Sequence, residues 1–80
     1  MLATDKQISY LTNLQERYNK MMEATKQYMP PTNVEFYHFD YNHERSKGMT
    51  TIDASLKIGA FKQLIRNINN VRILCNLNQL

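Results

Sequence analysis

The chain has 80 residues and a net charge of +3, with 42% hydrophobic and 21% charged residues, which excludes general disorder and predicts one globular domain with a small core. A single cysteine, Cys75, excludes an intrachain disulfide and a cysteine-rich zinc finger and favours an intracellular protein. No apolar run approaches the roughly 20 residues that span a bilayer, and the first residues turn polar at once, so we expect a soluble, cytoplasmic protein with neither a membrane helix nor a signal peptide.

A long helix is predicted from about residue 5 to residue 28. Thr4 and Gln7 have the spacing of a capping box, in which each backbone N–H donates to the other side chain. At about 1.5 Å per residue this helix would reach on the order of 35 Å, which favours a far end that projects or meets another molecule. Pro30 and Pro31 end the helix. Its apolar residues recur every three or four positions: Ile8, Leu11, Leu14, Tyr18, Met21, Met22 and Met29.

The insert from about residue 30 to residue 48 has no clear period. Residues 34–39 alternate for a few positions, which predicts a short strand. One strand without a partner cannot satisfy its own backbone, so an extended loop over the helices and a short helix capped by Asn33 are the alternatives. Ser46, Lys47 and Gly48 predict a turn before the next element.

A second helix is predicted from about residue 51 to residue 69, because Thr50 and Asp53 repeat the capping-box spacing. Asn69 and Asn70 predict its end or a kink, since asparagine tolerates the left-handed conformation that closes helices. A short third helix, or a continuation, follows from about residue 71 to residue 78, with Cys75 as a buried thiol. The apolar stripe of the second helix is Ala54, Ile58, Phe61, Ile65 and Ile68, widened by Leu56 and Leu64.

The expected fold class is therefore mainly α. It is a small helical bundle of two capped helices plus a short C-terminal helix, with an irregular or briefly extended aromatic insert between the first two.

The two helix starts, residues 3–11 (ATDKQISYL) and residues 49–58 (MTTIDASLKI), resemble the paired signature of a family of small helical modules. That signature is an Ala-Thr-x-Lys-Gln-x-x-Tyr-Leu helix followed by a Leu-Thr-Lys-x-Glu-Ala-Ser helix. Such modules occur in phage and bacterial proteins, alone or attached to DNA-processing proteins, and are mostly domains of unknown function. The resemblance implies a phage or mobile-element origin and a role around nucleic acid. The long aromatic insert departs from the pattern.

Charge is divided unevenly along the chain. Residues 1–44 hold four Lys or Arg against six Asp or Glu, and residues 45–80 hold six against one, a balance of −2 against +5. A concentrated basic segment attracts polyanions or an acidic protein face, although such residues can also only solvate the outer face of a helix. With few acidic residues nearby, we expect these cations to lack local partners. The candidate binding residues are Arg45, Lys47, Lys57, Lys62, Arg66 and Arg72.

Aromatic residues gather in the insert next to these cations. Phe36, Tyr37, Phe39 and Tyr41 fall within six residues, close to His38 and His43. Flat rings stack on bases at about 1–3 kcal/mol each while Lys and Arg neutralise phosphates, so this mixture is typical of single-stranded nucleic-acid sites. We take Tyr37 and Tyr41 as candidate stacking platforms, with core packing between the helices as the alternative.

No pattern predicts catalysis, a metal or a cofactor. There is no Gly-rich phosphate loop, nucleophile elbow or carboxylate pair, and His38, Asp40, His43 and Glu44 match no zinc motif. We therefore expect a non-enzymatic phage-type accessory protein, in the host cytoplasm if phage-encoded, that binds nucleic acid through the basic half and the insert. The alternatives are a protein-binding module, such as a phage-encoded inhibitor of a host nuclease or defence complex, and a homodimer through the long helix and its methionines.

Overall fold

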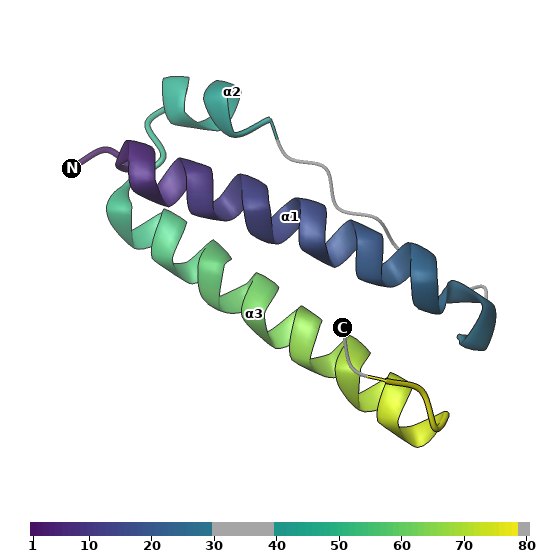
Figure 1. Ribbon diagram of the computed structural model, residues 1–80. Coiled ribbons are helices and arrows are strands. Elements are labelled where there is room, and N and C mark those ends of the chain that lie inside the picture. The colour runs from purple at the N-terminus through teal and green to yellow at the C-terminus, as the bar shows by residue number, and fades with distance from the viewer. Residues whose placement is uncertain (30–39, 79–80) are drawn as a thin grey trace.

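The computed structural model describes residues 1–29 and 40–78 and contains three α-helices in that part of the chain. These are α1 (Asp5–Thr25), extended by a 3-10 turn (Lys26–Tyr28), α2 (Tyr41–Ser46) and α3 (Thr51–Leu74). The predicted mainly α fold class is confirmed. Figure 1 shows α1 and α3 side by side and running in the same direction, with α2 beside the N-terminal half of α1.

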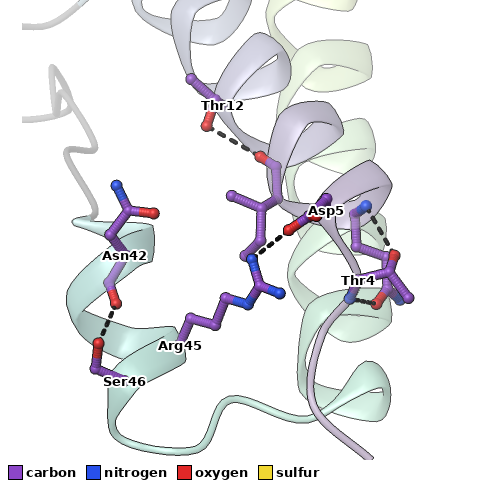
Figure 2. Close-up of polar contacts among 8 residues, drawn as sticks. Thr4, Asp5, Thr12, Asn42, Arg45 and Ser46 are labelled. Atoms are coloured by element: carbon purple, nitrogen blue, oxygen red, sulfur yellow. Dashed lines mark hydrogen bonds and ion pairs between the residues drawn. The ribbon is translucent and has the colours of Figure 1, made fainter.

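Both predicted capping boxes are present. The N–H of Gln7 donates to the Thr4 hydroxyl over 3.1 Å, and the N–H of Thr4 donates to the Gln7 side chain over 3.0 Å, as Figure 2 shows. Thr50 and Asp53 make the same exchange over 3.1 and 3.3 Å. Each box satisfies donors that a helix start leaves unpaired, and each is worth about 1 kcal/mol.

Hydrogen bonds join the segment at the start of α1 to the segment at the start of α3. Leu2 and Thr50 form an isolated antiparallel bridge, in which the N–H of Ala3 donates to the Met49 carbonyl over 2.9 Å and the N–H of Thr51 donates to the Met1 carbonyl over 3.1 Å. The Gln7 amide also donates to the Thr51 carbonyl over 3.1 Å. These bonds hold the N-termini of α1 and α3 at one end of the molecule, which gives the parallel arrangement.

The core fills the seam between α1 and α3. At its centre Tyr18 and Phe61 meet edge to face, with ring centroids 6.1 Å apart. Leu56, which the sequence adds to the apolar stripe, points the other way and is 69% exposed. It lies about 200° around the helix from Ala54, on the face opposite the core. The buried hydrophobic residues are Ala3, Leu11, Leu14, Tyr18, Met21, Met22, Tyr41, Met49, Ala54, Phe61, Ile65 and Ile68.

The C-terminal end differs from the prediction. α3 continues through Asn69 and Asn70 to Leu74, so the predicted end at these asparagines and the separate third helix are wrong, and the alternative of a continuation is confirmed. The residue that follows the C-cap residue Cys75 is Asn76, whose φ is 60°. Its N–H donates to the Ile73 carbonyl over 3.0 Å, and the N–H of Leu77 donates to the Arg72 carbonyl over 2.7 Å, which is a Schellman motif. An asparagine in the left-handed conformation therefore closes the helix, but it is Asn76, six residues after Asn70.

Two further expectations about helix ends are corrected. Cys75, the C-cap residue of α3, is exposed rather than buried, because the apolar run around it passes onto the outer face of the helix. The far end of α1 does not project, since Thr25 is fully buried against α3. The whole is elongated, 43 by 19 by 15 Å, because the two long helices lie along each other.

Within the insert, the structure describes only the part from residue 40 onward. α2 is capped by Asp40, whose carboxylate accepts from the N–H of His43 over 3.1 Å. The predicted turn follows it, with Gly48 at a φ of 102°, a conformation that favours glycine. The alternatives of a strand at 34–39 and a helix capped by Asn33 lie outside the described residues.

Candidate functional site

A groove of about 420 Å³ runs along one side of the seam between α1 and α3. Three of its lining residues are cations, Arg17 from α1 and Lys62 and Arg66 from α3, and none of the lining residues within 1–29 and 40–78 is acidic. Since cations of both helices flank one groove, they create a locally positive surface. The described lining residues are Tyr10, Leu14, Arg17, Lys62, Ile65, Arg66, Asn69, Asn70 and Ile73.

Helical spacing explains why these residues meet. On α1, Tyr10 and Arg17 stand seven residues apart and therefore share a face. On α3, Lys62 and Arg66 are four apart, and Asn69 continues the same strip. Leu14 and Ile65, both buried in the core, form the floor of the groove. Because α1 and α3 run in the same direction, the two strips border one groove along its length.

The ring of Tyr10, which lines the groove, lies next to a cation. The Nζ of Lys62 lies 5.4 Å from the centroid of the Tyr10 ring, within range of a cation–π interaction. Further along, Arg66 donates to the Gln63 side chain over 3.4 Å. Within residues 1–29 and 40–78, the ion pairs involve neither Lys62 nor Arg66. Both cations therefore keep their charge available for an anion.

Two of the other predicted cations have acidic partners. Arg45 pairs with Asp5 at the start of α1, as Figure 2 shows, and the Nζ of Lys57 lies 3.4 Å from a carboxylate oxygen of Glu44. The expectation concerned local partners, and these two partners are not local. Asp5 precedes Arg45 by 40 residues and Glu44 precedes Lys57 by 13, and the fold brings each carboxylate to its cation.

The last two predicted cations also lie outside the groove lining. Lys47 is exposed in the turn after α2. Arg72 donates from Nη1 to the Thr25 hydroxyl over 3.0 Å and from Nε to the Asn78 carbonyl over 2.6 Å. Arg72 thus joins the far ends of α1 and α3. Of the six predicted cations, only Lys62 and Arg66 line the groove.

The structure describes one of the two predicted stacking platforms. Tyr37 lies outside the described residues. Tyr41 is only 4% exposed and belongs to the core, so its ring is not accessible to a base and the prediction is wrong for this residue. Burial, followed by the negative charge of Glu44, raises the pKa of Tyr41 to about 12.

The buried position of Tyr41 predicts a loss of stability at high pH. Tyr41 ionises at about pH 12 in the folded protein and near 10 when unfolded. The folded state holds the phenolic proton of Tyr41 more tightly than the unfolded state, so the protonated side chain contributes fully to the free energy of unfolding below pH 10. This contribution, on the order of 2 kcal/mol, is lost as the pH rises from 10 to 12. Urea midpoints measured across this range should fall more steeply for the wild type than for Tyr41→Phe. Equal slopes in the two proteins would contradict the burial of this hydroxyl.

The sequence did not identify five of the groove residues as part of a site: Tyr10, Arg17, Asn69, Asn70 and Ile73. Tyr10 and Arg17 flank the apolar stripe of α1 on one side, and Lys62, Arg66 and Asn69 flank that of α3. The sequence signal for these residues is their position beside the apolar stripe of each helix. Which side of α1 lies next to which side of α3 depends on how the two helices pack.

Comparisons with protein-family models, with curated proteins and with solved structures found no match. In the described part of the chain, no helix combines the length and apolar character needed to cross a membrane. The same residues contain no group of three or more His, Cys, Asp or Glu side chains placed to hold a metal ion.

Proposed function

We propose that this protein is a non-enzymatic accessory protein that binds nucleic acid through the groove between α1 and α3. The observation that carries the proposal is the gathering of Arg17, Lys62 and Arg66 on one groove whose described lining contains no acidic residue. Lys and Arg bind phosphates and release the counterions condensed on the strand, which supplies most of the affinity in such complexes. The resemblance of the two helix starts to phage and bacterial modules supports a place among proteins that act around DNA or RNA.

Salt dependence tests the proposal directly. Labelled oligonucleotides should bind at about 50 mM salt and much more weakly at about 200 mM. With three phosphate contacts on a single strand, the logarithm of the association constant should fall with the logarithm of salt concentration with a slope of about −2. Lys62→Gln and Arg66→Gln should each make that slope shallower by about 0.7.

The matched control is Arg45→Gln. Arg45 is also a cation of the C-terminal half, but it pairs with Asp5 and does not line the groove. Its replacement should leave both the affinity and the salt slope close to those of the wild type. Absence of binding by the folded wild type at about 50 mM salt would remove the proposal, because phosphate contacts are strongest there.

A protein-binding function is the second candidate, because α3 exposes two large apolar residues on the face opposite the core. Ile52 and Leu56 are 71% and 69% exposed and four residues apart, so they form one patch. An inhibitor of a host nuclease or defence complex could use such a patch. A stoichiometric partner that survives nuclease treatment and is lost with Leu56→Lys would favour this function, and a partner retained by that variant would count against the patch.

A further inference from the structure

Tyr10 presents a partly free ring at the mouth of the basic groove. It is 43% exposed and is the one aromatic residue among the lining residues that the structure describes. Its backbone belongs to the second turn of α1, next to the fully buried Leu11, so the ring is mounted on a rigid element beside the core. A flat ring that is held in place and bordered by cations is what stacking on a nucleic-acid base requires.

We propose that Tyr10 is the stacking platform of the groove and that the ligand is a single-stranded nucleic acid. This inference rests on the proposed function and specifies its ligand. Tyr10 supplies the contact with a base, and Lys62, Arg17 and Arg66 supply the contacts with phosphates. In this inference Tyr10 takes the role that the sequence gives to Tyr41.

The cation on the Tyr10 ring does not prevent stacking. An exposed cation–π contact such as that of Lys62 is worth about 0.5–1 kcal/mol, whereas a base stacked on an aromatic side chain is worth about 1–3 kcal/mol. The base therefore displaces the ammonium group from the ring. Lys62 lies next to the same ring, so its ammonium remains within reach of the phosphate attached to that nucleotide. Stacking and phosphate binding then reinforce each other.

The groove favours a single strand over a duplex for an energetic reason. Bases in a duplex already stack on each other, and exposing one costs a few kcal/mol, which one ring worth about 1–3 kcal/mol does not recover. Seven residues of helix separate Tyr10 from Arg17, or about 10 Å, the length of about three stacked nucleotides at about 3.4 Å each. Asn70, further along, offers an amide donor and acceptor to the edges of unpaired bases.

Two single strands with equal numbers of phosphates test the inference. One is a short oligothymidylate and the other is the same strand with abasic sites in place of the bases. The wild type should bind the strand with bases about 5- to 100-fold more tightly. Tyr10→Phe should keep this preference because it keeps the ring. Tyr10→Leu should bind both strands with similar affinity, while its salt slope stays that of the wild type because the phosphate contacts are unchanged.

The matched control is Tyr28→Leu. Tyr28 is 45% exposed, nearly the same as Tyr10, but it lies in the 3-10 turn after α1 and does not line the groove. The Tyr28→Leu variant should keep the wild-type preference for the strand with bases over the abasic strand. Far-UV circular dichroism should show all variants folded, since each replaced ring is partly exposed.

The outcomes separate this inference from the proposed function. Wild-type protein that binds both strands equally, with a clear salt slope, would overturn the role of Tyr10 and leave the basic groove intact. Tighter binding to a duplex of matched length would overturn the single-strand specificity. Failure to bind any of these nucleic acids at low salt would remove the function itself, and with it the inference.

Discussion

Replacing Phe61 by alanine should lower the free energy of unfolding by about 3–5 kcal/mol. Phe61 is 3% exposed at the middle of the seam, edge to face with Tyr18. Its removal leaves a cavity between two parallel helices that are fastened mainly at their ends. A domain of this length is typically stable by only about 4–12 kcal/mol, so the variant should be partly or wholly unfolded at moderate temperature.

Urea unfolding followed by far-UV circular dichroism measures this effect. Phe61→Leu, which keeps much of the apolar volume, should lose substantially less stability than Phe61→Ala. Leu56→Ala is the sharper control. The sequence places Phe61 and Leu56 in the same apolar stripe, but Leu56 is exposed and its truncation should cost less than about 0.5 kcal/mol. Equal destabilisation by Phe61→Ala and Leu56→Ala would mean that α3 presents a different face to α1.

The helix starts were predictable because the interactions that create them are local. A capping box joins residues three positions apart, so Thr4 with Gln7 and Thr50 with Asp53 are visible without any tertiary information. The spacing of apolar residues identified the core faces for the same reason, since it depends only on the helical repeat. Leu56 shows the limit of that argument. Adding this one residue to the apolar stripe of α3 extends the stripe onto the face opposite the core.

The end of α3 was misplaced because local preference competes with packing. Asn69 and Asn70 can close a helix, but Ile68 is buried against α1 and Arg72, one turn further on, bonds to Thr25. These contacts carry the helix past the asparagines, and the same left-handed tendency acts at Asn76, whose φ is 60°. The end of α3 therefore depends on packing as well as on local preference.

The candidate site was only half predictable, because its residues come from two helices whose relative direction the sequence does not state. Lys62 and Arg66 follow from spacing on α3 alone. Tyr10 and Arg17 join them because the chain runs parallel in α1 and α3, which depends on hydrogen bonds between residues more than forty positions apart. The ion pair of Arg45 with Asp5 has the same origin. The number of charged residues along the chain does not show any of these contacts between distant residues.

Arg72→Met should destabilise the protein by about 2–3 kcal/mol while leaving nucleic-acid binding unchanged. The methionine keeps an apolar stem but removes the guanidinium, which bonds to the fully buried Thr25 and to the Asn78 carbonyl. Thr25 is the last residue of α1, and the described last turn of α1 has no basic residue of its own. Arg72 therefore also places a positive charge at the negative end of the neighbouring helix, where a cation is favourable by about 0.3–1 kcal/mol.

A double-variant cycle isolates this bond. Thr25→Val removes the acceptor at nearly constant volume and should cost about 1–3 kcal/mol. The double variant should then lose clearly less than the two single losses added together, because both changes remove the same bond. Arg66→Met is the matched control, since Arg66 lines the groove. It should be as stable as the wild type within about 0.5 kcal/mol but bind oligonucleotides with a shallower salt slope. An Arg72→Met protein that behaved like Arg66→Met would place Arg72 among the binding residues and extend the basic surface beyond the groove.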